Sequence, residues 1–177
     1  FHHKQEAALG DVRAIKTSDI PNFDILLAGF PCQPFSNAGN RKGVNDDNGR
    51  GTLFEVCERV LKDKIDSGHK PKAFIFENVR GILSSKMADG TTVPEEIKKR
   101  MNSLDYEVSQ QLVCASDYGV PQKRYRVLII GIDRNLHGNK IIRFDFTKLD
   151  ELIIENKISS EKNGTGDKLV VGEILKD

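Results

Sequence analysis

The sequence lacks a long apolar run: no segment approaches the roughly 20 consecutive apolar residues that a membrane-spanning helix needs. Cysteine is scarce, and Cys32, Cys57 and Cys114 form no Cys-x-x-Cys pair of the kind found in zinc or redox sites. Charge of one sign is also missing, because 27 basic and 26 acidic residues leave a net charge of only +1. These absences argue against a membrane protein, a disulfide framework and a protein that coats DNA by bulk charge. They favour an intracellular, reducing setting.

The N-terminus, Phe1-His2-His3-Lys4, has no initiator methionine and no charged segment that leads into an apolar stretch. It therefore lacks the features of a secretory signal, and we expect the chain to start within a longer protein. A length of 177 residues suits a single domain with one continuous core.

Apolar patterning predicts an alternation of strands and helices. A helix is predicted over Thr52–Ile65, where apolar residues recur at helical spacing, and it should end near Gly68 and Pro71. A second helix is expected to start at Pro94, with acidic residues in its first turn. The expected strands are four short, β-branched apolar runs: Asp24–Ala28, Ala73–Phe76, Glu107–Val113 and Arg126–Ile132. This order predicts an α/β fold with a largely parallel, doubly wound sheet, in which ligands bind at the carboxyl ends of strands.

Beyond Phe146 the sequence turns polar, and a Ser, Asn and Gly-rich stretch over 159–167 has the composition of a flexible connector. We therefore expect one partial domain over residues 1–146 and a polar connector over residues 147–177.

Cys32 directly follows the first predicted strand and lies between Pro31 and Pro34 in a segment that should be rigid. A thiol at such a strand end is a candidate nucleophile if nearby positive charge or hydrogen-bond donors favour its thiolate. The alternative interpretation is a small buried apolar residue, as most lone cysteines are.

Glu77 emerges from the apolar run Phe74-Ile75-Phe76 at the same predicted edge of the sheet. Removal of its carboxylate from water would favour the protonated form and allow it to act as a general acid. A carboxylate that caps a loop or pairs with a basic side chain is the alternative interpretation.

Gln122, Arg124 and Arg126 alternate ahead of the last predicted strand, which would place all three on one face. Their guanidinium groups could neutralise a phosphate, hold a carboxylate or polarise a carbonyl oxygen. A solvated basic edge strand is the alternative. The glycine-rich, basic stretch 37–51 is compatible either with a mobile lid over a nucleic acid or with a surface loop.

Together these segments resemble the cytosine carbon-5 DNA methyltransferases, whose motifs are Pro-Cys-Gln followed by Phe-Ser, then Glu-Asn-Val, then Gln-x-Arg-x-Arg. All three are present in order, at 31–36, 77–79 and 122–126. Two shorter matches, Gly10-Asp11-Val12 and the stretch 50–54, extend the resemblance over roughly 10–135. It implies the Rossmann-like S-adenosylmethionine-dependent methyltransferase fold, here with an incomplete doubly wound sheet.

The resemblance also implies roles for single residues. Cys32 would add to carbon 6 of a cytosine, Glu77 would protonate or hydrogen-bond the ring nitrogen at position 3, and Arg126 would contact the base oxygen and Glu77. Arg124 would support the Cys32 loop and a nearby phosphate, and Asn78 would have a structural role. No metal is implied. Substrate contacts are implied for Pro31, Gln33, Ser36, Arg41 and Gln122.

The implied cofactor is S-adenosylmethionine, with Asp11 at its adenine amino group and Phe30, Pro31 and Leu53 around it. The glycine-rich block that opens the family's cofactor site would precede Phe1, and the target-recognition region would follow the chain. We therefore expect the isolated chain to be inactive.

The implied partner is double-stranded DNA with a flipped-out cytosine, and an associated restriction enzyme is a further partner that the family suggests. A cytoplasmic setting, bacterial or phage-encoded, or association with the nucleoid would fit. Three alternatives remain: a transfer RNA cytosine methyltransferase, which the core motifs do not separate from a DNA enzyme; a catalytically dead DNA-binding fragment; and a different thiol enzyme. The last would need a histidine near Cys32, but the four histidines lie outside the three motifs.

Overall fold

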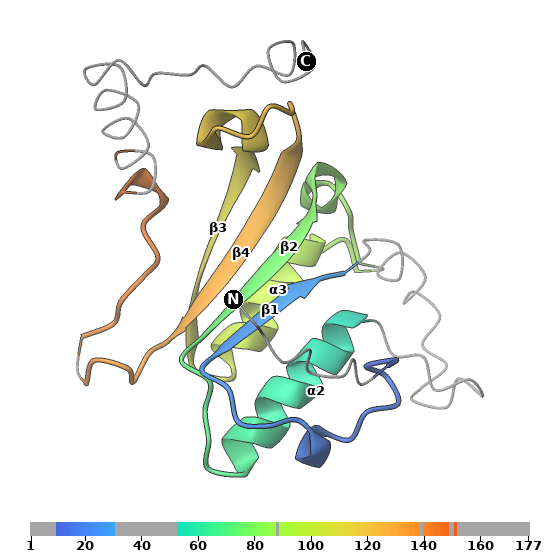
Figure 1. Cartoon of the computed structure of the whole chain (residues 1–177), viewed down its shortest axis with the longest axis vertical. Helices are drawn as coiled ribbons and strands as arrows, with labels where there is room; N and C mark the ends of the chain where they lie inside the picture. Colours follow the sequence, from blue (N-terminus) through green and yellow to red (C-terminus); the bar gives the residue numbers. More distant parts are fainter. Residues whose placement is uncertain (1–9, 31–52, 88, 139, 149–150, 152–177) are drawn as a thin grey trace, which may run out of the picture.

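A computed structural model of the chain describes residues 10–30, 53–87, 89–138, 140–148 and 151. The named elements over these residues are four strands, two α-helices and three 3-10 helices, and Figure 1 shows how they are arranged. The strands are β1 (Ile25–Gly29), β2 (Ala73–Val79), β3 (Tyr106–Cys114) and β4 (Tyr125–Asp133); the α-helices are α2 (Leu53–Asp66) and α3 (Val93–Asn102); and the 3-10 helices are η1 (Thr17–Asp19), η2 (Arg80–Leu83) and η3 (Ala115–Tyr118).

The four strands form one sheet in the order β1-β2-β4-β3. β1 and β2 are parallel, whereas β4 is antiparallel to both of its neighbours, β2 and β3. The prediction of a largely parallel sheet is therefore wrong for these strands. The reason is local: only 10 residues separate Cys114 from Tyr125, too few for the helical crossover that a parallel connection requires.

Both α-helices pack on one face of the sheet, where β2 contributes the buried rings of Phe74 and Phe76. Phe54 of α2 lies edge-on to Phe76, with ring centroids 6.1 Å apart. Arg100 of α3 places its guanidinium 4.8 Å from the centroid of the Phe54 ring and also pairs with Glu58 of α2. The predicted apolar stripe of α2 is confirmed, and it explains why this helix lies flat against the sheet.

The helix ends follow from identifiable residues. Thr92 and Glu95 form a reciprocal capping box, so α3 begins one residue before the predicted Pro94. α2 ends ahead of Gly68, which adopts a left-handed backbone conformation with φ of 81°.

The face of the sheet opposite the helices is partly open. On β1 the side chains of Ile25 and Leu27 are 54% and 70% exposed. Residues 140–148 follow β4 and return along the β3 side of the sheet (Figure 1), where Phe146 is buried. Arg143 anchors this segment by pairing with Glu107 of β3.

Within the described residues, no helix is both long and apolar enough to span a membrane, and no group of three or more His, Cys, Asp or Glu side chains could hold a metal ion. Most of the predicted connector over 147–177 lies outside the described residues, so the boundary at residue 146 stays a prediction.

Candidate active site

Strand register brings two of the predicted site residues together. Gly29, at the end of β1, pairs with Glu77 of β2, and Val79 of β2 pairs with Arg126 of β4. Side chains two residues apart on a strand share a face, so Glu77 and Arg126 project from adjacent strands on the face opposite the helices. The pair therefore lies beside the end of β1, and Cys32 follows Gly29, the last residue of that strand, by three positions in the sequence.

Glu77 and Arg126 form an ion pair in which Nε of Arg126 lies 2.5 Å from Oε1 of Glu77. The contact is electrostatic rather than a well-directed hydrogen bond, since the buried Nε has no hydrogen-bond partner among the described residues. Nη1 of Arg126 donates to the backbone oxygen of Tyr125 at 2.7 Å. Nε of Arg126 is thus held against Glu77 and away from solvent.

The environment of Glu77 differs from the sequence-based expectation. Its side chain is 44% exposed, compared with 21% for Arg126, and it lies inside β2 rather than after it. β2 continues to Val79 because β4 pairs with it along that length. The neighbouring guanidinium, rather than removal from water, is the dominant feature around this carboxylate among the described residues.

Asn78 joins the ends of β1 and β2 on the opposite face. Its side chain is buried, and Nδ2 donates a hydrogen bond of 2.7 Å to the backbone oxygen of Phe30. Its Oδ1 in turn accepts from the backbone N–H of Val79 at 2.9 Å. The amide thus fixes the backbone at Phe30 relative to β2. The structural role of Asn78 within a working site stays a prediction.

Gly29 is a site residue that the sequence reasoning missed. A Cβ atom added to Gly29 would lie 3.1 Å from Oε2 of Glu77, so a larger residue would push the carboxylate away. The available signal was the position of this glycine, which directly follows an apolar strand and precedes the Pro-Cys-Gln motif.

Gln122 and Arg124 do not share the extended conformation of Arg126. The backbone N–H of Gln122 donates to the oxygen of Val120 at 2.7 Å, and that of Arg124 donates to the oxygen of Gln122 at 2.9 Å. These consecutive tight turns precede β4, so the predicted strict alternation of the three side chains along one strand is wrong. Gln122 and Arg124 are both exposed beside the site.

The predicted cofactor residues fit in part. Asp11 is exposed, and its pKa is lowered to about 2 by hydrogen bonds from Arg13, so it offers an ionised acceptor, although one shared with that guanidinium. Phe30 is only 5% exposed and packs on Phe54 and Phe76. Its ring can therefore line the bottom of a site but presents no open face to a ligand. Leu53 is half-buried against the same cluster.

Several predicted residues lie outside the described residues: Pro31, Cys32, Gln33, Ser36 and Arg41. The other two cysteines are described and are free thiols. Burial raises the pKa of the Cys57 thiol on α2 to about 11, which keeps it protonated and unreactive at neutral pH. Cys114 is buried at the end of β3.

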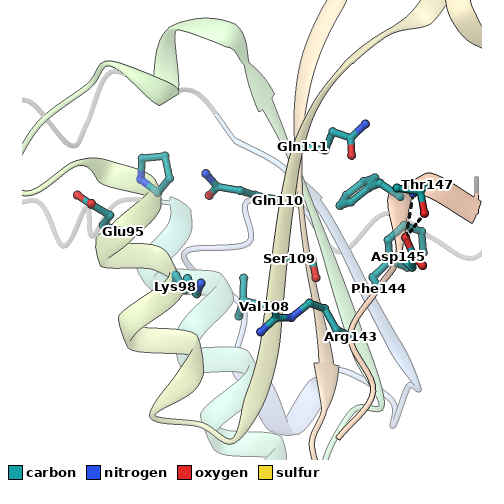
Figure 2. A pocket seen from close by; sticks show the side chains of 12 residues that line it. Glu95, Lys98, Val108, Ser109, Gln110, Gln111, Arg143, Phe144, Asp145 and Thr147 are labelled. Atoms are coloured by element: carbon teal, nitrogen blue, oxygen red, sulfur yellow. Dashed lines mark hydrogen bonds between the residues drawn. The ribbon is translucent and has the colours of Figure 1, made fainter. Parts of the chain in front are cut away.

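A cavity of about 640 Å³ lies elsewhere, where β3 faces the start of α3 and the returning segment 143–147 (Figure 2). Its lining is mixed, with Lys98, Gln110 and Arg143 among the polar side chains. None of the residues predicted to carry the chemistry lines it, so this cavity is separate from the pair formed by Glu77 and Arg126.

Comparison with known proteins gives consistent matches in sequence. A family model described as C-5 cytosine-specific DNA methylase matches residues 1–177. Type II methyltransferase M.NlaIV of Neisseria lactamica is 39% identical over 168 residues, which cover 92% of this chain and 37% of that protein. Type II methyltransferase M.HaeII of Haemophilus aegyptius is 43% identical over 143 residues, covering 81% of this chain and 40% of that protein. The chain therefore spans well under half the length of these relatives.

Solved structures give consistent matches in fold. The S. pombe Dnmt2 methyltransferase superposes with a TM-score of 0.53 at 17% identity, covering 80% of this chain and 38% of that one. DNMT2 of Spodoptera frugiperda gives a TM-score of 0.53 at 26% identity, covering 76% of this chain and 38% of that one. The sheet described above is thus shared with methyltransferases of known structure.

Proposed function

Because the chain belongs to the C-5 cytosine-specific DNA methylase family, we propose that the protein containing it transfers a methyl group from S-adenosylmethionine to carbon 5 of a cytosine in DNA. The observation that carries this proposal is the ion pair between Glu77 and Arg126 beside the end of β1. It sets an acidic group and a fixed cation next to the strand that leads into the Pro-Cys-Gln motif.

The proposed roles follow from the chemistry of each group. Cys32, as its thiolate, forms a bond from Sγ to carbon 6 of the cytosine, which makes carbon 5 nucleophilic. Glu77 supplies a hydrogen bond or proton to the ring nitrogen at position 3, and Arg126 offers donors to the base oxygen. Carbon 5 would then take up the methyl group that the bound cofactor supplies. Transfer of the proton at carbon 5 to a base, with departure of the Cys32 sulfur as thiolate, restores the aromatic ring.

Placement of the reacting groups depends on the strand ends. Asn78 holds the backbone at Phe30, and Gly29 leaves room for the Glu77 carboxylate against β1. Both contacts set the position of the end of β1, at Gly29 and Phe30, relative to the Glu77 carboxylate. Correct positioning of this kind is worth orders of magnitude in rate, because misplacement by about 1 Å can cost about 100-fold.

When bound, S-adenosylmethionine would supply the electrophilic methyl group. Of the described residues, Asp11 would accept a hydrogen bond from its adenine amino group, while Phe30 and Leu53 would form the apolar floor. Without the cofactor, the Asp11 carboxylate pairs with Arg13. On cofactor binding, it would exchange this partner for the adenine amino group.

The substrate is proposed to be duplex DNA with the target cytosine turned out of the helix, since carbon 6 is shielded by stacking within a duplex. The names of the relatives, Type II methyltransferases of bacteria, further support a role in a restriction-modification system, with a cognate restriction enzyme as a partner in the bacterial cytoplasm.

The decisive experiment uses the full-length protein that contains this chain. It is mixed with S-adenosylmethionine and DNA that contains fluorocytosine, whose fluorine cannot leave carbon 5 as a proton does. We expect a covalent adduct that survives denaturation, is lost in Cys32→Ser and persists in the matched control Cys57→Ser. Parallel reactions with fluorocytosine-containing RNA assign the substrate class. Bound S-adenosylmethionine without an adduct on either nucleic acid would contradict the proposal.

A further inference from the structure

Arg80, the residue that follows the Glu-Asn-Val motif, is held against an aromatic ring. Its guanidinium carbon lies 5.8 Å from the centroid of the Tyr125 ring. Register explains the contact, because Val79 pairs with Arg126, which places the next residue of one strand beside the preceding residue of the other. Both side chains reach solvent, Tyr125 with 38% of its surface exposed.

The cation at Arg80 differs from the cation at Arg126. The charge of Arg126 is compensated by Glu77. Among the described residues, no ion pair is formed by Arg80 or by its exposed basic neighbours Lys123 and Arg124. Beside the pair of Glu77 and Arg126, the strand register thus brings three exposed cations to one end of β2 and β4, and none of them has an ion-pair partner in the described part of the chain.

Support from an aromatic ring matters for what Arg80 can bind. A guanidinium that packs on a ring keeps its N–H groups directed outward, and it loses less side-chain freedom when it binds an anion than a freely moving cation would. Its planar donor array matches two oxygens of one phosphate. Tyr125 therefore orients the cation without cancelling its charge.

We propose that Arg80, oriented by Tyr125 and assisted by Lys123, binds a backbone phosphate of the DNA next to the turned-out cytosine. This inference rests on the proposed function, and it adds a residue outside the three sequence motifs to the DNA-binding surface. The contact reads no base, so it contributes affinity and helps to hold the strand whose nucleotide has left the helix.

The test is the salt dependence of DNA binding by the full-length protein. The probe is a labelled duplex with the site that bisulfite sequencing shows the wild-type protein to methylate. Loss of one phosphate contact lowers the slope of log K against log salt by about 0.9. Between 50 and 200 mM salt, the affinity of Arg80→Gln should thus fall about 3.5-fold less than that of wild type. At low salt the variant should bind more weakly, with a raised KM for DNA and an unchanged kcat.

Two further variants separate the ring from the charge. Tyr125→Leu removes the platform and should weaken binding with less change in slope, because Arg80 keeps its charge. Lys62→Gln, which removes an exposed cation on α2, is the matched control and should leave both slope and KM unchanged. Thermal unfolding midpoints equal to wild type confirm that each variant is folded.

The outcomes distinguish this inference from the proposed function. A wild-type slope and KM in Arg80→Gln, or a loss confined to kcat, overturns the phosphate contact while methyl transfer stands. A wild-type protein that binds S-adenosylmethionine but forms no adduct with DNA overturns the proposed function first, and the phosphate contact with it.

Discussion

At the scale of single residues, the site depends on groups that support its geometry and take no part in the proposed reaction. Gly29 provides space, Asn78 provides a fixed backbone, and Tyr125 provides a surface, whereas Glu77 and Arg126 are the groups proposed to meet the substrate. These two proposed substrate-contacting residues lie in sequence motifs. The supporting contacts depend on which strands are neighbours, and sequence spacing does not contain that information.

Gly29→Ala tests the spatial role. The new Cβ would lie 3.1 Å from Oε2 of Glu77, so the carboxylate must move by a few tenths of an ångström or rotate away. We expect kcat/KM for methyl transfer by the full-length protein to fall about 10- to 100-fold, with little change in the unfolding midpoint. Gly81→Ala is the control, because an added Cβ there meets no atom within 4 Å. Equal activity of Gly29→Ala and wild type would show that Glu77 does not need this placement.

At the scale of elements, apolar patterning located the four strands and the helices α2 and α3 of the described residues but not their arrangement. The four predicted strands match β1 to β4, and the predicted stripe over Thr52–Ile65 matches α2 to within a residue at each end. The predicted parallel direction of the strands was wrong, because strand direction depends on the length of the connection between β3 and β4, and that connection is short. The prediction also ended the second strand too early, at Phe76, whereas β2 continues through Glu77 to Val79. Pairing with β4, rather than the apolar run, sets where that strand ends.

Packing between β2 and β4 supplies the second prediction. Gly131 pairs with Phe74, and a Cβ at position 131 would lie 2.0 Å from the ring atom Cε1. Gly131→Ala should therefore destabilise the protein by about 1–3 kcal/mol, or more if the sheet cannot relax. Urea unfolding measures the change. The double variant Gly131→Ala with Phe74→Leu should lose less than the sum of the single variants, because it removes the ring that the methyl group meets. Strict additivity would show that the two sites do not interact.

At the scale of the whole molecule, one carboxylate joins regions far apart in sequence. Glu107 of β3, with a side chain 10% exposed, pairs with Arg134 after β4 and with Arg143 in the returning segment. The hydrogen bond from Arg143 is the main cause that holds the pKa of Glu107 below its usual range; burial opposes it, and the hydrogen bond from Arg134 and the charges of both arginines add to the lowering. No sequence pattern singled out this residue, since its partners are 27 and 36 positions away.

The pH dependence follows from the direction of that shift. Because the folded protein holds the Glu107 proton less tightly than the unfolded chain, the stabilisation is fully present above the unfolded pKa of roughly 4.3. It is lost as pH falls through the lower folded pKa. Glu107→Gln should be less stable than wild type at pH 7 in urea unfolding, and the difference should shrink below about pH 4. Asp66→Asn, at an exposed carboxylate on α2, is the control. A difference independent of pH would exclude the ionised pair as its source.

The antiparallel insertion of β4 between β2 and β3 also has a kinetic consequence. β3 and β4 are neighbours in sequence and can form a hairpin early, whereas Arg126 reaches Glu77 only when that hairpin has docked on β2. The ion pair between Glu77 and Arg126 therefore forms only when β4 has paired with β2. A partly folded chain in which β2 and β4 have not yet paired holds the Glu77 carboxylate and the Arg126 guanidinium apart.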